Sequence, residues 1–512
     1  MSTRNLVRHI HTLGTIRGAL EGAEGKVVAF RGVPYAAPPV GPLRFAPSQP
    51  AIPWQGVRDA TANGPIAPQT ALRVDRAMGP ITAAQGEDCL TLTVWTSADA
   101  GAKAPVMVWL HGGGFITGAG SLPWYDGGNL AARHGVVVVC VNYRLGALGF
   151  LPVPSRLPGN LGLLDQIAAL RWVQRHIEVF GGDPARVTVM GQSGGAHNIA
   201  SMLAISDTEG LFHRAILQSP PLAIGLMTSG EAARRGGVFL KQLGIDPDQP
   251  DLVDSLRALT VPDLLAAQVK AMVALGAAQK GDLRPPFLPA EGAPHDFPSP
   301  ELVERAAANA AARGVDVLIG WTHDEANLYV AANPALAAIS EAELESAAAA
   351  MVGFSAATMI VAARAARPGA PPGQIFLDLM TETTFAAPCK ALARAIARAG
   401  GRAFLYRFDW QSPSAALGAC HCLDIPFALG TWRAWMNAPI MAGANEAAVE
   451  DLSAEMMRRW AGFATTGDPG FAPACGDALP IMVFDRERDS RHRWEPMRHE
   501  PRHGDKNIAG RM

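Results

Sequence analysis

The chain has 512 residues, of which 49% are hydrophobic and 18% charged, so it can bury a large core and is not a highly charged, disordered protein. Its 44 Lys and Arg nearly balance its 46 Asp and Glu. This balance argues against a nucleic-acid partner, because such partners select a basic surface.

Neither a secretory signal nor a membrane span is expected. Residues 1–22 carry scattered arginines without a continuous apolar stretch, and no window approaches about 20 uninterrupted apolar residues. The six cysteines have no C-x-x-C spacing and are too sparse for a disulfide scaffold. We therefore expect a reduced, cytoplasmic globular protein, whose oligomeric state the sequence leaves open.

Apolar runs of strand length alternate with helical patterns early in the chain. Residues 106–111 and 135–143 are typical of strands buried on both faces of a parallel sheet. Residues 161–180 repeat apolar side chains with a 3.6-residue period, end at a Gly-Gly-Asp-Pro stop and precede a strand at 187–190. This alternation predicts an α/β fold with a mostly parallel, doubly wound central sheet.

Ala-rich helical patterns dominate residues 223–312 and 331–400. Strands are predicted at 315–321 and 402–409, and a late helix at 447–466. Because no repeat or linker divides the chain, we expect one large domain over residues 1–512. The two Ala-rich regions are then helical insertions that form a lid or pocket wall.

Residues 191–195, Gly-Gln-Ser-Gly-Gly, match G-x-S-x-G, the nucleophile elbow. The motif follows the predicted strand and opens a helical stretch at 196–205. Small residues two before and two after Ser193 permit the sharp turn that exposes a nucleophile. The alternative is an ordinary Gly-rich turn, but this context favours Ser193 as a nucleophile.

A second glycine-rich segment, His-Gly-Gly-Gly-Phe at residues 111–115, follows the apolar strand residues 106–110. Attack on a carbonyl builds negative charge on oxygen, which backbone N–H donors stabilise. The segment matches the loop that accompanies a nucleophile elbow. We expect the N–H groups of Gly113, Gly114 and Gly194 to form the oxyanion hole; the alternative is a flexible connector.

A serine nucleophile needs a base, and the base needs an acid. The chain order Ser, Asp/Glu, His that accompanies this elbow selects His421 among 13 histidines. His197 should lie below the elbow, and others lie in polar terminal stretches: His9, His11, His492, His499 and His503. The acid should follow the strand at 315–321, where Asp324 and Glu325 both fit, and position alone does not separate them.

The Cys-His-Cys run at residues 420–422 does not predict a metal site. Adjacent residues rarely point at one ion, and no second ligand pair is near. We expect no metal and no cofactor.

The chain resembles the type B carboxylesterase family, an α/β-hydrolase group that includes cholinesterases and bacterial para-nitrobenzyl esterases. The resemblance extends over residues 18–501, and these segments carry it: 30–36, 38–45, 87–90, 142–146, 159–166 and 460–469. It implies that Ser193 is the nucleophile, His421 the general base and Glu325, not Asp324, the acid. It also implies two structural ion pairs, Arg44 with Glu87 and Arg144 with Asp165.

Several positions depart from the family pattern. Gln192 stands where the family usually has Glu, which removes a negative charge that a cationic substrate would use. Gly194 replaces Ala, and Ala326 follows Asp-Glu in place of Gly. The usual disulfide partner of Cys89 would fall near Ala67. No tryptophan stands near Gly79 to hold a quaternary ammonium, which argues against acetylcholine as a substrate.

The resemblance and motifs predict a serine carboxylic-ester hydrolase acting on small to medium, neutral, apolar esters, with a small-molecule ester as its partner. Aryl amide or carbamate hydrolysis by the same triad is the alternative, and a non-catalytic binding protein is a minor one. We expect Phe115, Gln192, Leu222 and Phe287 in the substrate pocket, with Arg284 and Pro285 nearby. Most of these side chains fit equally well as plain core or lid residues.

Overall fold

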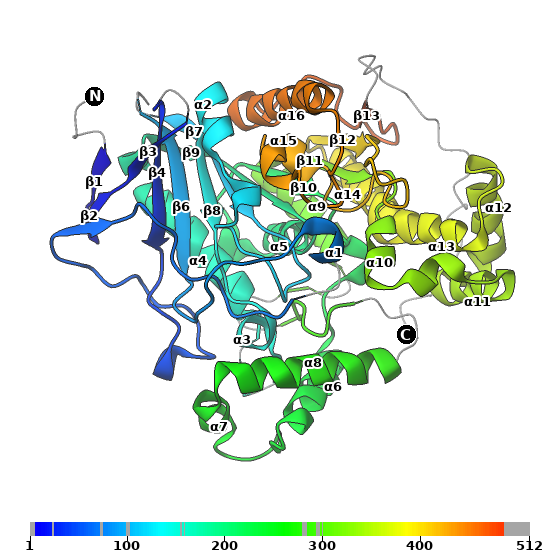
Figure 1. Ribbon diagram of the computed structural model, residues 1–512, viewed down its shortest axis with the longest axis horizontal. Coiled ribbons are helices and arrows are strands. Elements are labelled where there is room, and N and C mark those ends of the chain that lie inside the picture. The colour runs from blue at the N-terminus through cyan, green and yellow to red at the C-terminus, as the bar shows by residue number, and fades with distance from the viewer. Residues whose placement is uncertain are drawn as a thin grey trace.

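A computed structural model describes residues 6–22, 25–71, 75–98, 103–153, 156–157, 159–278, 284–292, 297–298 and 301–485 (Figure 1). His492, His499 and His503 lie outside these residues.

A ten-stranded sheet runs through the molecule in the order β13-β12-β11-β10-β9-β7-β8-β6-β4-β3. Six neighbouring pairs, from β8 to β13, are parallel and the other three are antiparallel. The predicted mostly parallel sheet is therefore confirmed. The strands are β3 (Ala19–Glu21), β4 (Val27–Pro34), β6 (Thr91–Ser97), β7 (Ala104–Leu110), β8 (Val137–Val141), β9 (Gly182–Gln192), β10 (Arg214–Gln218), β11 (Asp316–Thr322), β12 (Ala403–Phe408) and β13 (Ile481–Phe484).

Alternating side chains of each central strand enter different cores, because successive residues of a strand point to opposite faces. In β7, Val106 and Val108 join one buried cluster, and Met107 and Trp109 join another. The first cluster is covered by α4 (Leu161–His176), α5 (Gly194–Leu203), α9 (Leu302–Arg313) and α14 (Ala387–Arg398). The second is covered by α2 (Gly128–His134), α15 (Ile425–Ala428) and α16 (Glu446–Thr466). Helices thus cover both faces, as in a doubly wound fold.

Seven further helices lie at the lower and right-hand sides of Figure 1. They are α6 (Ser229–Gln242), α7 (Leu252–Ala258), α8 (Val261–Ala278), α10 (Asn327–Ala332), α11 (Glu341–Val352), α12 (Ala356–Ala366) and α13 (Pro372–Thr381). Three of them, α6, α7 and α8, also contribute buried side chains to the first cluster. Both predicted insertions therefore contain peripheral helices, but α9 and α14 within them pack on the sheet.

By length and composition alone, the helical run Glu341–Ala366 could cross a membrane, and so could Leu252–Ala258 and Val261–Gly276 taken together. The expected absence of a span therefore stays a prediction.

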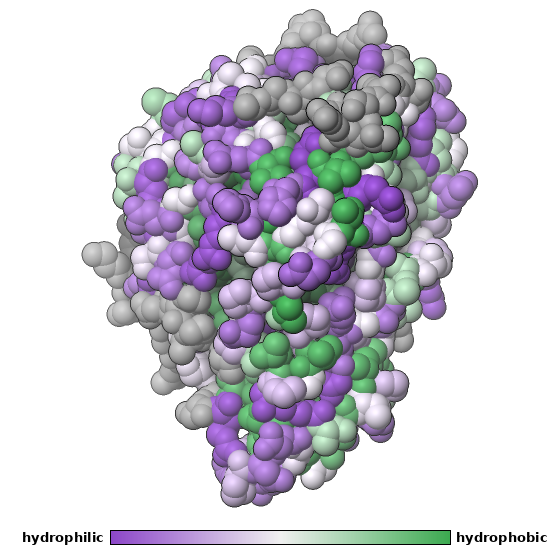
Figure 2. Space-filling view, turned by 90° about the vertical axis from the view of Figure 1, so that its left-hand side faces the viewer, coloured by the Kyte–Doolittle hydropathy of each residue, from purple (hydrophilic) through white to green (hydrophobic). Residues whose placement is uncertain are grey.

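A small second sheet, which the sequence patterns do not predict, joins β1 (Val7–Ile10), β2 (Gly14–Arg17) and β5 (Val57–Asp59). The face of the molecule on this side is mostly hydrophilic, with small, separate hydrophobic patches (Figure 2).

Two short helices complete the list for the described part of the chain: α1 (Asp75–Met78) and α3 (Gly146–Phe150).

The two ion pairs that the resemblance implies are both present. Arg44 pairs with Glu87 through two contacts, one of them from Nε to Oε1 at 2.6 Å. Arg144 pairs with Asp165 through Nη2 and Nε at 2.7 and 2.8 Å, and both of these side chains are buried. A buried pair of this geometry fixes local structure, because removing one partner would leave an unpaired charge.

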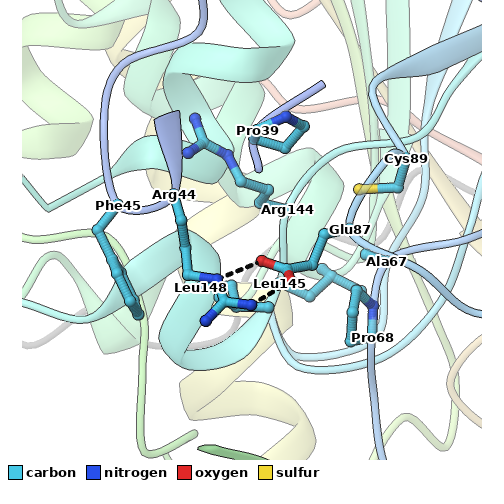
Figure 3. Close-up of a pocket in the computed structure, with 10 residues that line it drawn as sticks. All are labelled: Pro39, Arg44, Phe45, Ala67, Pro68, Glu87, Cys89, Arg144, Leu145 and Leu148. Atoms are coloured by element: carbon cyan, nitrogen blue, oxygen red, sulfur yellow. Dashed lines mark hydrogen bonds and ion pairs between the residues drawn. The ribbon is translucent and has the colours of Figure 1, made fainter. Parts of the chain in front are cut away.

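A small cavity lies beside these arginines (Figure 3). It is lined by Cys89, by Ala67, near which the usual disulfide partner of Cys89 is expected to fall, and by apolar residues such as Phe45 and Leu148. None of the predicted catalytic residues lines it. It is therefore a packing feature of the N-terminal loops, separate from the predicted site.

Candidate active site

Ser193 lies on the sharp turn between β9 and α5, with φ 55° and ψ −122°. Such a conformation is strained for a residue other than glycine and is typical of functional turns. A Cβ on Gly191 would lie 2.7 Å from the carbonyl oxygen of Leu110, and one on Gly195 only 2.1 Å from the same atom. Gly191 and Gly195 must therefore be glycines, because each lies too close to the backbone at the end of β7 to carry a side chain.

The loop after β7 lies beside this turn, because Leu110 at the end of β7 is paired with Gly191 in β9. Gly113 and Gly114 have φ values of 113° and 58°, in the region that favours glycine. No described residue accepts a hydrogen bond from either N–H. The N–H of Gly194 is the first of α5 and has no acceptor within its own helix. The backbone N–H groups of Gly113, Gly114 and Gly194 are thus all available to donate hydrogen bonds to a ligand.

Gln69 braces this loop, a role that no motif in the sequence indicates. Its buried side chain accepts hydrogen bonds from Thr117 Oγ1 (2.7 Å) and Gly118 N–H (2.8 Å) and donates to the Gly118 carbonyl (3.0 Å). Because both the oxygen and the nitrogen of the Gln69 amide are hydrogen-bonded to residues 117 and 118, this side chain fixes the shape of the loop after β7.

His421 and Glu325 come together from the ends of adjacent strands, β12 and β11. His421 Nδ1 contacts Glu325 Oε2, and the Thr322 N–H donates to Glu325 Oε1 at 2.8 Å. Both side chains are buried. Burial opposes the charged form of His421, but Cys422, Tyr329 and Glu325 outweigh it, so the pKa of the imidazole is raised above its ordinary value.

Asp324, the residue that position alone did not separate from Glu325, points elsewhere. It accepts hydrogen bonds from the Ala419 N–H at 2.9 Å and from Arg367 Nη2 at 2.6 Å. Burial would raise the pKa of its carboxyl, but the hydrogen bond from His323 and these other donors lower it well below its usual range. Asp324 therefore anchors the loop that leads to His421, while Glu325 contacts the imidazole.

The second nitrogen of His421 faces Gln192. The side-chain nitrogen of Gln192 lies 3.0 Å from His421 Nε2. Among the residues that the structure describes, no hydrogen bond joins the Ser193 hydroxyl to His421. Catalytic hydrogen bonds are often long in unliganded enzymes and tighten when substrate binds.

The predicted pocket residues Phe115, Gln192, Leu222 and Phe287 are all buried, and their role toward a substrate stays a prediction. The Phe115 ring lies at the elbow: a Cβ on Gly194 would be 3.3 Å from it. A Cβ on Gly114 would be 3.5 Å from Pro285, which places Pro285 beside the oxyanion loop. Arg284 pairs with Glu231 of α6. His197 lies on α5, away from the imidazole of His421, with its Nε2 2.9 Å from the Gly225 carbonyl.

No group of three or more His, Cys, Asp or Glu able to hold a metal ion occurs in the described part of the chain. All six cysteines are free thiols, and only Cys475 is exposed. The expected cytoplasmic location stays a prediction.

Comparisons with known proteins agree over nearly the whole chain. The profile of the carboxylesterase family matches residues 4–504. A probable N-octanoylanthranilate hydrolase of Rhodococcus erythropolis is 38% identical over 448 residues, 86% of this chain and 90% of that protein. Phenmedipham hydrolase of Pseudarthrobacter oxydans is 35% identical over 486 residues, 93% of this chain and 92% of that protein. The solved structure of a PNB esterase superposes with a TM-score of 0.77 at 34% identity, covering 94% of this chain and 96% of that one.

Proposed function

We propose that this chain, which belongs to the carboxylesterase family, cleaves small to medium, neutral, apolar carboxylic esters through an acyl-enzyme formed on Ser193. Hydrolysis of ester bonds by an α/β-hydrolase fold follows from the family and its solved structures. The roles of individual residues and the class of ester are the parts that we add.

One observation carries the residue assignments. The carboxyl ends of the parallel strands bring together a half-buried serine on a sharp turn, a glycine loop and a buried His–Glu pair. In open α/β sheets, ligands bind at the carboxyl ends of the strands. A nucleophile with a carboxylate-oriented imidazole and backbone donors beside it supports acyl transfer.

In the first half of the reaction, Ser193 Oγ attacks the ester carbonyl while His421 Nε2 takes the hydroxyl proton. Glu325 accepts from Nδ1–H, which fixes the ring and stabilises the imidazolium. The carbonyl oxygen becomes an oxyanion, stabilised by three backbone N–H donors: those of Gly113, Gly114 and Gly194.

Collapse of this intermediate breaks the bond to the alcohol oxygen, which takes the proton from His421 Nε2 and leaves. The serine is then acylated. In the second half, His421 takes a proton from water, the hydroxide attacks the acyl carbonyl, and the proton returns to Ser193 as the acid is released. No net proton is gained or lost by the side chains over the cycle.

The Ser193→Ala variant tests the assignment. We expect turnover of a para-nitrophenyl ester to fall by at least about 10³-fold, as in other hydrolases that lose the nucleophile. Ser201→Ala is the matched control, because Ser201 lies on α5, the helix that follows Ser193, and among the described residues its hydroxyl donates only to the His197 carbonyl. Retained activity in Ser193→Ala, with the control also active, would refute the assignment.

Amide or carbamate hydrolysis is the second candidate function. The relative named for N-octanoylanthranilate supports it, since that compound joins an acyl chain to an aromatic amine, and phenmedipham is a carbamate. The same triad can cleave an ester, an amide or a carbamate bond. Turnover of a matched aryl ester and anilide separates the candidates: equal or faster turnover of the anilide favours amide hydrolysis as the function.

A further inference from the structure

Gln192 is the last residue of β9, directly before the proposed nucleophile, and its side chain is buried. Its amide nitrogen lies 3.0 Å from Nε2 of His421, although 229 residues separate the two in sequence. The two nitrogens of the imidazole therefore have different partners: Glu325 at Nδ1 and Gln192 at Nε2.

These partners fix the tautomer of the ring. An ionised carboxylate only accepts hydrogen bonds, so Nδ1 carries the proton that faces Glu325. In the neutral ring, Nε2 then has a lone pair and accepts from the amide N–H of Gln192. This is the same lone pair that takes the proton of Ser193 in the proposed reaction.

The other end of the amide faces the oxyanion loop. A Cβ on Gly112 would lie 2.7 Å from Gln192 Oε1 and 3.1 Å from the Cβ of Ser193. The amide is therefore held between the loop, the nucleophile and the imidazole, and the absence of a side chain at Gly112 makes room for it. A packed side chain of this kind can position its neighbours.

Few charged groups face His421 besides Glu325. The titratable groups around it are Tyr329 of α10, whose ring is 6.2 Å away, and Cys422 and Asp424 of its own loop. Phe385 packs against it at 5.1 Å and is apolar. Gln192 contributes hydrogen bonding without charge, so Glu325 is the one carboxylate in direct contact with the ring among the described residues.

We propose that Gln192 is a positioning residue for the base: its uncharged amide holds His421 in the neutral, Nδ1-protonated form and gives up the Nε2 lone pair to Ser193 when substrate binds. The inference rests on the proposed function, since it acts through the triad. A glutamate of the same length would instead accept from Nε2–H and stabilise the protonated ring, which cannot act as a base.

The experiment compares wild type with Gln192→Glu and Gln192→Met by kcat/KM for a neutral para-nitrophenyl ester from acidic to alkaline pH. We expect Gln192→Glu to move the acid limb upward by at least about one pH unit, a tenfold loss of activity on the acid side. Gln192→Met removes the donor to Nε2 without adding charge, so its acid limb should move upward by less.

Thermal unfolding monitors folding, and Gln192→Met carries the test if Gln192→Glu does not fold. Superposable pH profiles in folded variants, including an equal loss of activity at every pH, would overturn the proposal and leave Gln192 a purely structural residue. Labelling of wild type with an organophosphonate distinguishes this failure from failure of the proposed function. If Ser193 is not labelled in wild type, the triad itself is wrong.

Discussion

Of two adjacent glycines at the nucleophile elbow, Gly195 should tolerate an added methyl group poorly and Gly194 should tolerate it well. A Cβ on Gly195 would meet the Leu110 carbonyl oxygen at 2.1 Å, where real Cβ atoms stay beyond about 3.0 Å. The nearest atoms to a Cβ on Gly194 would be those of the Phe115 ring, at 3.3 Å. The first contact is with backbone of a central strand, which cannot rotate away, whereas an aromatic ring can shift by a few tenths of an ångström.

The magnitudes follow from these contacts. Alanine is favoured over glycine by about 1 kcal/mol in a helix interior; Gly194 and Gly195 are the first two residues of α5, so this value is an upper limit for both and does not separate them. Overpacking in a close-packed region costs about 1–3 kcal/mol, so Gly195→Ala should lose stability while Gly194→Ala stays near wild type. To bring a Cβ on Gly195 from 2.1 Å to 3.0 Å from the Leu110 carbonyl oxygen, the turn that carries Ser193 must move by about 0.9 Å. A displacement of that size at a catalytic group costs about 10²-fold in rate.

The assay is denaturant unfolding together with para-nitrophenyl ester turnover on both variants. We expect Gly195→Ala to be less stable and about 10²-fold slower, with Gly194→Ala close to wild type in both. Equal stability and activity of the two variants would refute the reasoning, because it would mean that the elbow does not press against the end of β7.

Three further predictions follow from the site and its surroundings. Because the pKa of His421 is raised above 6.5 and a base must be neutral, kcat/KM should fall as pH drops through a value above 6.5; an acid limb below that value contradicts it. Burial raises the pKa of Asp424 from 3.8 to about 6. The stability that the protonated Asp424 carboxyl gives the folded protein is therefore complete below pH 3.8 and is lost as the pH rises through 6. Unfolding experiments should therefore show Asp424→Asn gaining about 2 kcal/mol relative to wild type as the pH rises from about 4 to about 7, and a pH-independent difference would contradict this. Ala67→Cys should form a disulfide with Cys89 across the cavity that both line, stabilising the protein by about 3 kcal/mol; thiol titration that finds seven free cysteines would contradict it.

The sequence predicted the parts of the fold that depend on strong local patterns. The apolar runs at β7, β8, β11 and β12 are long enough to identify buried strands, and the family resemblance and the α/β-hydrolase fold are confirmed. The sequence did not predict β10, because only Ala215, Ile216 and Leu217 within it are apolar. Such a short run carries no period, and only pairing with β9 and β11 makes it a strand.

At the site, sequence motifs predicted Ser193 and the glycine loop, and the chain order Ser, Asp/Glu, His predicted His421. They could not separate Asp324 from Glu325 by position, since adjacent residues point in different directions only once the backbone turn is known. Nor could they find the brace from Gln69 or the contact of Gln192 with His421. Both depend on residues brought together from distant parts of the chain, for which one sequence carries no local signal.

The most direct test of the central claim is the reaction of the protein with a fluorophosphonate, followed by intact mass and peptide mapping. The account predicts a single adduct on Ser193, none in Ser193→Ala, and much slower labelling in His421→Ala and Glu325→Gln. An adduct on another residue, or labelling of Ser193 at the wild-type rate without the imidazole, would contradict it.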